Sequence, residues 1–168
     1  MVIERLRSSE VNIIAYDPFM DVERAKPLGV ELCSLDDVFR HADVISLHTP
    51  WLPETVGMIT GEHFRLMKPN ASFINTARGA VVKENELIEA FQARPDLFAL
   101  LDVTYPEPPA SDSLLLTLPN VIVTPHIAGS MGDECRRMGR FIVDELDRWL
   151  AGEPCKHLVT REYARAFG

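Results

Sequence analysis

The sequence predicts an open, doubly wound α/β fold, in which a parallel sheet has helices on both of its faces. Short apolar runs recur along the chain, and their starts lie about 24 to 33 residues apart, the length of a strand plus a returning helix. The runs are apolar throughout rather than alternating, which is typical of parallel strands covered on both faces. The segments between them carry helix start signals and apolar stripes at helical spacing.

The strands are expected in the order of these apolar runs. The runs cover residues 11–16, 44–47, 71–74, 97–101 and 121–123, and a further, weaker strand is expected at 30–33. Each later strand should follow a helical crossover, because parallel neighbours cannot be joined by a tight turn.

Helix starts are expected where Ser34-Leu-Asp-Asp37 and Ser130-Met-Gly-Asp133 fit a capping-box pattern. Leu87, Ile88 and Phe91 form one apolar stripe at helical spacing. A second stripe predicts a long final helix of about five turns. It comprises Met131, Cys135, Met138, Ile142, Leu146 and Trp149. We interpret this stripe as core packing, and the alternative is a face that binds a partner.

Composition and charge fit one soluble globular domain. The chain has 168 residues and a mass of 18.9 kDa, with 17 Lys plus Arg, 25 Asp plus Glu and a net charge of −8. An acidic surface of this kind argues against non-specific binding to nucleic acid or anionic lipid. The longest apolar run, at 97–101, is far too short to span a bilayer, and the first residues carry no apolar signal segment.

The cysteines point to a reducing environment. Cys33, Cys135 and Cys155 are odd in number and widely spaced, so they make neither a disulfide framework nor a metal-binding box. We therefore expect reduced thiols, no metal site and a cytoplasmic location.

Polar residues follow the expected strands where the strands end. Arg78, Glu107 and His126 come after three consecutive strands, the last three of the sheet. In an open parallel sheet, ligands bind outside the carboxyl ends of the strands, and neighbouring ends lie about 4.8 Å apart. One small molecule could therefore contact all three side chains.

Each of these residues also has a plain structural interpretation. Arg78 precedes a glycine and fits a turn, Glu107 lies among prolines and fits a solvated loop, and His126 alone fits a surface or core position. Asp17, which follows the first strand, fits a turn former or helix cap. Chance seldom places Arg, Glu and His at successive strand ends, so the joint pattern favours a site. The other histidines lack such a setting: we expect His41, His63 and His157 at the surface and His48 in a structural role.

These side chains suit the oxidation of an alcohol beside a carboxylate. Arg78 offers a planar fork that grips a carboxylate in two places, and His126 takes or gives a proton near neutral pH. Glu107 on the other ring nitrogen of His126 would fix the tautomer and favour the imidazolium. The hydride needs an acceptor that side chains do not supply, so a nicotinamide cofactor is required. Asp17 suits the ribose hydroxyls of NAD and would repel the 2′-phosphate of NADP.

Several motifs follow one another between residues 2 and 152. They are Tyr16-Asp17-Pro18, Ala42-Asp43-Val44-Ile45-Ser46-Leu47-His48-Thr49-Pro50, Glu54-Thr55, Met67-Lys68, Ile74-Asn75-Thr76-Ala77-Arg78-Gly79, Leu101-Asp102-Val103, Pro106-Glu107-Pro108 and Thr124-Pro125-His126-Ile127-Ala128-Gly129. In order and spacing the sequence resembles the NAD-dependent D-isomer-specific 2-hydroxyacid dehydrogenases. The resemblance implies a Rossmann-like fold and hydride transfer between NAD and a D-2-hydroxy acid or its 2-keto acid.

The resemblance also assigns roles to individual positions. Arg78, Glu107 and His126 fall on the family's catalytic Arg, Glu and His. The positions that bind the cofactor correspond to Asp17, Thr49, Pro50, Thr55, Thr76, Ala77, Asp102 and Gly129.

The sequence departs from this family at its start. The family's cofactor domain opens with a strand and a Gly-x-Gly-x-x-Gly turn, whereas the first glycine here is Gly29 and no Gly-x-Gly occurs. Residues 1–9 fit the back half of the helix that follows that turn. In the strand order 3-2-1-4-5-6 the absent strand is the central one, so its neighbours should face each other across about 10 Å. The cofactor pyrophosphate would also lose its helix N-terminus.

We therefore expect the C-terminal piece of a longer enzyme, with a partial NAD-binding domain at 1–152 and a tail at 153–168 that leads to the substrate domain. Alone, this piece should bind NAD weakly and turn over nothing. Two alternatives are a non-catalytic NAD(H)-binding module, like the NADH-responsive corepressors related to these enzymes, and an inactive relic. The expected partners are a small 2-hydroxy or 2-keto acid and a second copy in a homodimer, with neither nucleic acid nor membrane.

Overall fold

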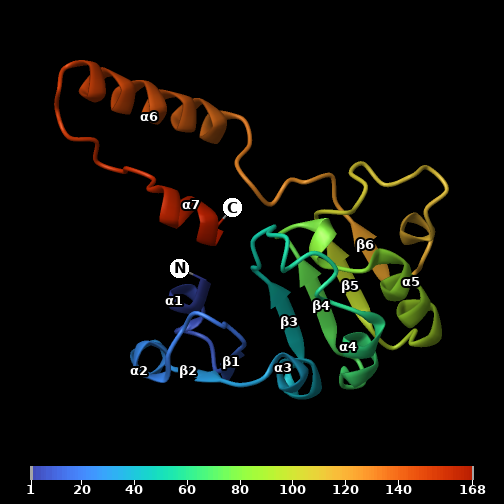
Figure 1. The fold of residues 1–168 in the computed structure, drawn as a ribbon. Helices are drawn as coiled ribbons and strands as arrows, with labels where there is room; N and C mark the ends of the chain where they lie inside the picture. Colours follow the sequence, from blue (N-terminus) through green and yellow to red (C-terminus); the bar gives the residue numbers. More distant parts are fainter. Residues whose placement is uncertain (1, 168) are drawn as a thin grey trace.

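The strands form two separate parallel sheets in the computed structural model, which describes residues 2–167 (Figure 1). The smaller sheet pairs β1 (Ile13–Ala15) with β2 (Val30–Leu32). The larger sheet has the order β3-β4-β5-β6 and comprises β3 (Val44–Leu47), β4 (Ser72–Asn75), β5 (Phe98–Leu101) and β6 (Val121–Val123). Every pairing is parallel, so the carboxyl ends of neighbouring strands lie at the same edge. The prediction of a parallel α/β fold is confirmed.

Helices lie before, between and after the strands. They are α1 (Val2–Leu6), α2 (Val22–Ala25), α3 (Leu35–His41), α4 (Gly61–Leu66), α5 (Glu84–Ala93), α6 (Asp133–Leu150) and α7 (Arg161–Phe167), with 3₁₀ turns at η1 (Lys26–Leu28), η2 (Gly79–Val81) and η3 (Leu114–Leu116). Ser34 caps α3 as predicted, because its hydroxyl oxygen accepts a hydrogen bond from the backbone N–H of Asp37 at 3.1 Å. A helix within the tail, α7, is not anticipated by the sequence.

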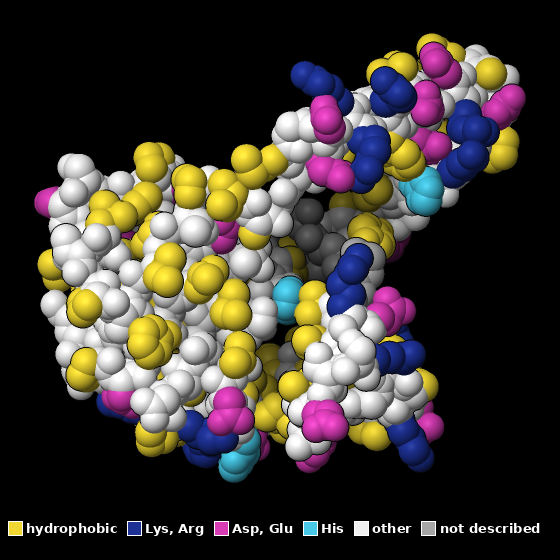
Figure 2. Space-filling model, turned by 180° about the vertical axis from the view of Figure 1, so that it is seen from behind, with side chains coloured by type: hydrophobic (Ala, Val, Ile, Leu, Met, Phe, Trp, Pro, Cys, Tyr) yellow, Lys and Arg dark blue, Asp and Glu magenta, His cyan; other side chains and the backbone are white. Residues whose placement is uncertain are grey.

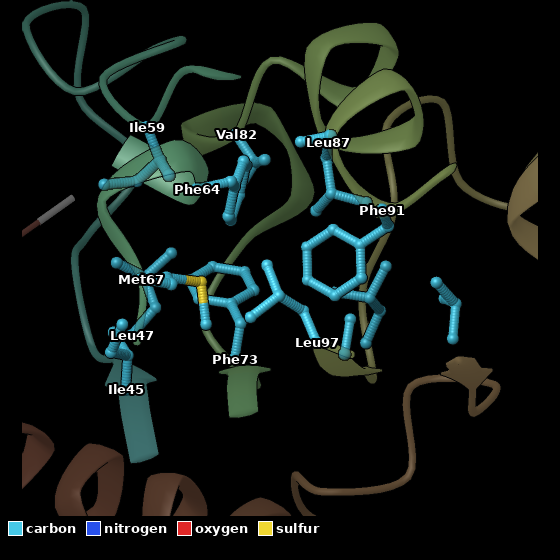
Figure 3. Packing of buried hydrophobic residues seen from close by; sticks show 14 of the residues in the cluster. Ile45, Leu47, Ile59, Phe64, Met67, Phe73, Val82, Leu87, Phe91 and Leu97 are labelled. Carbon is cyan, nitrogen blue, oxygen red and sulfur yellow. The ribbon is translucent and has the colours of Figure 1, made fainter. Parts of the chain in front are cut away.

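The hydrophobic core lies between the larger sheet and helices α4 and α5 (Figure 3). Phe64 of α4 is fully buried, and its ring makes edge contacts with Phe73 of β4 at 5.1 Å and with Phe91 of α5 at 5.5 Å between centroids. Burying each phenylalanine stabilises the fold by about 1.5–3 kcal/mol. This packing fastens both helices to the sheet and fixes the strands whose ends carry the candidate site.

Only one face of the larger sheet is covered by the described residues. Exposed and buried positions alternate along β3 and β5. On the open face, the side chains of Val44, Phe98 and Ile122 are each more than half exposed. In the described residues, this sheet therefore carries helices on one face, whereas the sequence predicts them on both. Apolar residues on both faces of a strand fit burial on both sides, but the pattern does not say which segment provides the cover.

Among the described residues, no strand pairs with both β1 and β3, so the two sheets are not joined by hydrogen bonds between strands. Figure 2 shows a hollow between the part that holds β1 and β2 and the larger part that holds β3 to β6. The break occurs where the sequence predicts an absent central strand. Within the described chain, β1 and β3 each keep an unpaired edge.

The long final helix forms as predicted, but the interpretation of its apolar stripe as core packing is wrong. Helix α6 has 18 residues and none of them is buried. Met138, Ile142 and Trp149 are all more than half exposed, and Figure 1 shows α6 projecting away from both sheets. The expected cap at Ser130 is also wrong, since the N-cap position is Gly132 and carries no side-chain hydrogen bond. In the described part of the chain, no helix is long and apolar enough to cross a membrane.

Candidate active site

Arg78 lies in a turn directly after β4, and the buried Asn75 side chain shapes that turn. The Asn75 Nδ2 group donates to the backbone carbonyl of Arg78 at 3.1 Å, and the N–H of Ala77 donates to Asn75 Oδ1 at 3.0 Å. The Arg78 guanidinium is exposed and makes one hydrogen bond, from Nη1 to the carbonyl of Ala77 at 2.7 Å. Its remaining donors are free of partners within the described chain, so the fork can receive a carboxylate.

Gly79 brings the Arg78 turn against the loop after β5. A Cβ at Gly79 would lie 2.1 Å from both the carbonyl carbon and the carbonyl oxygen of Thr104. Only glycine fits at this distance. The chain at Arg78 is therefore packed directly on the segment that leads to Glu107.

Glu107 and His126 form the contact that the sequence predicts. Glu107 Oε1 lies 2.6 Å from Nδ1 of His126, and each side chain is somewhat under half exposed. Within the described residues, Nε2 of His126 has no hydrogen-bond partner. A carboxylate on Nδ1 keeps the proton on that nitrogen when the ring is neutral, which leaves Nε2 as the free base.

The backbone of His126 is strained. Its φ is 54°, a left-handed conformation that is uncommon for residues other than glycine. The His126 N–H donates to the carbonyls of Asp102 and Thr124, both at 3.0 Å. Strain of this kind costs about 1–3 kcal/mol and persists where surrounding contacts hold it, often at functional sites.

The Asp102 side chain forms hydrogen bonds that hold the loop of His126 in place. Its carboxylate is buried, and Oδ1 accepts from the Thr124 hydroxyl at 2.6 Å and from the Ile127 N–H at 2.8 Å. Oδ2 accepts from the Ala128 N–H at 2.8 Å. Burial acts to raise the pKa of Asp102, but these hydrogen bonds outweigh it and hold the pKa below its ordinary value. In this structure the carboxylate positions the loop, a role that the sequence does not reveal.

The predicted cofactor positions separate into two groups. Thr49, Pro50, Thr55, Thr76, Ala77, Asp102 and Gly129 lie at or near the carboxyl edge of the larger sheet. Asp17 follows β1 in the smaller sheet, where its exposed carboxylate accepts the N–H of Phe19 at 2.8 Å. That bond makes Asp17 a turn former, as its plain interpretation expects, and the second oxygen is left available. The Thr55 hydroxyl closes its own loop by donating to the carbonyl of Pro50 at 2.7 Å.

The remaining histidines make other contacts. His63 is only 14% exposed and its Nδ1 accepts the N–H of Thr60 at 3.1 Å, so the prediction of a surface residue is wrong. It completes a capping box at the start of α4, a role usually filled by Glu or Gln, which is why the sequence pattern misses it. His41 and His157 are exposed, and His48 lies 3.0 Å from the Ser46 hydroxyl. Among the described residues no group of His, Cys, Asp and Glu could hold a metal ion.

The NAD-binding domain model of the D-isomer specific 2-hydroxyacid dehydrogenases matches residues 1–128. The chain belongs to this family. The matched segment contains Arg78, Glu107 and His126, so the resemblance drawn from the motifs is confirmed. Membership establishes this part of the chain as an NAD-binding domain of the dehydrogenase family.

Individual dehydrogenases of this family are similar over nearly the whole chain. The D-3-phosphoglycerate dehydrogenase of Archaeoglobus fulgidus is 39% identical over 158 residues, which are 94% of this chain and 30% of that protein. The structure of D-lactate dehydrogenase with NAD⁺ from Lactobacillus jensenii aligns with a TM-score of 0.80 at 32% identity, over 95% of this chain and 52% of that one. The holo form of Rhodotorula graminis D-mandelate dehydrogenase aligns with a TM-score of 0.82 at 30% identity, over 95% and 47%. The chain thus spans about a third to a half of these dehydrogenases.

Proposed function

We propose that the chain is the cofactor-binding part of an NAD-dependent oxidoreductase that interconverts a D-2-hydroxy acid and its 2-keto acid. The observation that carries this proposal is the 2.6 Å contact between Glu107 and His126. It lies next to the loop of Arg78, which is the carboxylate-binding group that the reaction needs.

The side chains have separate roles in the proposed reaction. Arg78 binds the substrate carboxylate through its fork and holds the neighbouring carbon in place. His126 takes the hydroxyl proton on Nε2 during oxidation and returns it to the keto oxygen during reduction. Glu107 stabilises the imidazolium that forms in the first case, and Asp102 keeps the loop of His126 in position.

The residues present fit part of an NAD molecule. The exposed carboxylate of Asp17 is suited to ribose hydroxyls. The described residues contain no glycine-rich turn at a helix N-terminus, so nothing in them suits the pyrophosphate. The chemistry that bound NAD supplies is the acceptance or release of the hydride.

We further propose that additional chain completes the fold. The break between β1 and β3 and the 30% coverage of the phosphoglycerate dehydrogenase support this proposal. In it, residues 1–152 are a partial NAD-binding domain and 153–168 lead towards a substrate domain. The protein is cytoplasmic and forms a homodimer, for which the exposed apolar stripe of α6 is the candidate surface.

The similar proteins share a class of substrate. The similar proteins are named for 3-phosphoglycerate, lactate and mandelate. All three are 2-hydroxy acids, so they share the carboxylate that Arg78 would bind and the hydroxyl that His126 would deprotonate.

The experiment that tests the proposal starts with the native gene product, purified from its own cells. Its intact mass should be well above 18.9 kDa, and it should oxidise NADH with at least one 2-keto acid. Binding of NADH without oxidation would replace the proposal with a non-catalytic binding module. If the protein neither binds nor oxidises NADH, the inactive relic is the remaining interpretation.

A further inference from the structure

Two aromatic side chains meet at the carboxyl edge of the larger sheet. Trp51 follows β3 and Tyr105 follows β5, and their ring centroids lie 5.7 Å apart with the rings at 80°. Strand β4 lies between β3 and β5, so the bases of the two loops are about 10 Å apart. The edge-to-face contact therefore reaches across the end of β4, from which the turn of Arg78 emerges.

This aromatic pair, Trp51 and Tyr105, lies beside the predicted catalytic residues. Gly79 packs against the backbone of Thr104, the residue before Tyr105. A Cβ at Gly79 would lie only 2.1 Å from that backbone. Two residues beyond Tyr105 comes Glu107, whose carboxylate contacts His126 at 2.6 Å. The loops that carry the aromatic pair thus flank the turn of Arg78 at the carboxyl edge of the sheet.

Both loops are braced by hydrogen bonds. The N–H of Tyr105 donates to Glu84 Oε2 at 3.1 Å, and the Thr104 hydroxyl donates to the carbonyl of Pro106 at 2.8 Å. On the other side, the N–H of Leu52, next to Trp51, donates to the Thr55 hydroxyl at 2.9 Å. The aromatic pair is therefore presented from ordered loops, which limits the conformational entropy that a ligand would have to remove.

The aromatic pair nevertheless remains open to solvent. Trp51 is 50% exposed and Tyr105 is 55% exposed. Isolated exposed aromatics need no functional explanation, but these two are joined and adjoin a site. Glu54 lies on the loop of Trp51 and Glu107 on the loop of Tyr105. Glu84 of α5 accepts the Tyr105 N–H.

We propose that the aromatic pair is the specificity element of this site, and that it selects a 2-hydroxy acid whose side chain is aromatic or bulky and apolar. The inference rests on the proposed function, because Arg78 must hold the carboxylate end of the same ligand. An apolar side chain gains by covering exposed ring surface, and an aromatic one adds the preference of rings for edge contacts. A methyl group offers much less apolar surface to the rings.

The test compares D-phenyl-lactate with D-lactate on the native gene product. Dissociation constants are measured by saturation-transfer NMR in the presence of NADH, so that no hydride transfer takes place. We expect D-phenyl-lactate to bind at least about tenfold more tightly than D-lactate. Trp51→Ala and Tyr105→Ala should remove most of this preference and leave the affinity for D-lactate unchanged, whereas Trp51→Phe should retain it. Leu116→Ala is the control, because this side chain is 50% exposed on η3, ahead of β6 rather than at the carboxyl edge, and it should change neither constant.

Each other outcome has a defined meaning. Equal binding of both acids by the wild-type protein would overturn the specificity inference and leave the proposed function standing. Equal weakening of both acids by Trp51→Ala would also overturn it, since the aromatic pair would then only brace the loops. Binding of neither acid would count against both the inference and the proposed function. Arg78→Ala separates the two questions, because it should weaken both acids alike.

Discussion

Glu107 Oε1 lies 2.6 Å from Nδ1 of His126, although the two residues are 19 positions apart and follow different strands. The contact depends on β5 and β6 being parallel neighbours, because only then do their carboxyl ends open at one edge. It converts a histidine on a strained loop into an oriented base with its second nitrogen free. The remaining site residues can be understood by how they support this arrangement.

Replacing Glu107 with Gln should slow turnover while leaving the fold intact. Glutamine keeps the size of the side chain but removes the charge that stabilises the imidazolium. A hydrogen bond to a charged group is worth about 1.5–3 kcal/mol, which corresponds to a loss in kcat of roughly 10- to 100-fold. The measurement is kcat for 2-keto acid reduction by the native gene product at saturating NADH. An unchanged kcat would remove Glu107 from the catalytic set.

Replacing Arg78 with Lys should weaken substrate binding far more than cofactor binding. Lysine keeps the positive charge but loses the planar fork that contacts a carboxylate at two points. We expect kcat/KM for the 2-keto acid to fall about 10- to 100-fold, and KM for NADH to stay within about twofold. Equal changes in both constants would show that Arg78 acts on the structure of the edge rather than on the substrate.

Replacing Gly79 with Ala should disrupt the site through packing alone. The new Cβ would lie 2.1 Å from the Thr104 backbone, so the loops after β4 and β5 would be forced apart. Overpacking of this kind costs about 1–3 kcal/mol of folding stability, and activity should fall with it. Gly139→Ala is the matched control, because nothing lies within 4 Å of its Cβ and alanine favours a helix. Urea unfolding of both variants checks the contrast, and equal stability would contradict the close approach.

Replacing Asp102 with Asn should destabilise the protein in a pH-dependent way. The carboxylate is buried and accepts three hydrogen bonds, so losing an acceptor costs about 1–3 kcal/mol at neutral pH. Its pKa is lower in the folded state than the ordinary value of about 3.9. The stabilisation is therefore fully present above about pH 4 and is lost as the pH falls through the folded pKa.

The corresponding measurement is urea unfolding of wild type and Asp102→Asn between about pH 7 and pH 2. The difference between their free energies of unfolding should shrink at the acid end. A difference that stays constant with pH would mean that the ionised carboxylate is not what holds the loop.

Local sequence signals predict the strands and the site better than they predict packing. The runs at 44–47 and 121–123 coincide with β3 and β6, while 11–16 shortens to Ile13–Ala15. A strand-end position follows from the order of the elements alone, so Arg78 and His126 can be placed without any contact information. The geometry of Glu107 against His126 then follows from the parallel pairing.

What the sequence cannot predict is decided by contacts between distant segments. The apolar stripe of α6 has core-like spacing, yet what covers a helix depends on the position of other elements, and here Ile142 is 64% exposed. From the sequence, Asp102 is assigned to the cofactor-binding residues. Its role in holding the loop is missed because its three hydrogen bonds come from residues more than 20 positions away. The contact between Trp51 and Tyr105 likewise arises only when β3 and β5 flank β4.

The most direct test of the account is transfer of deuterium from NADH labelled at C4 of its nicotinamide to the 2-position of a 2-keto acid. It should be run on the native gene product and on its His126→Asn variant. Asparagine tolerates the left-handed backbone of residue 126 but cannot serve as an acid or base. We predict labelled 2-hydroxy acid from the wild type and a rate at least about 10²-fold lower from the variant, with unchanged NADH affinity. Equal rates from the two proteins, or no transfer by the wild type with any 2-keto acid, would contradict the account.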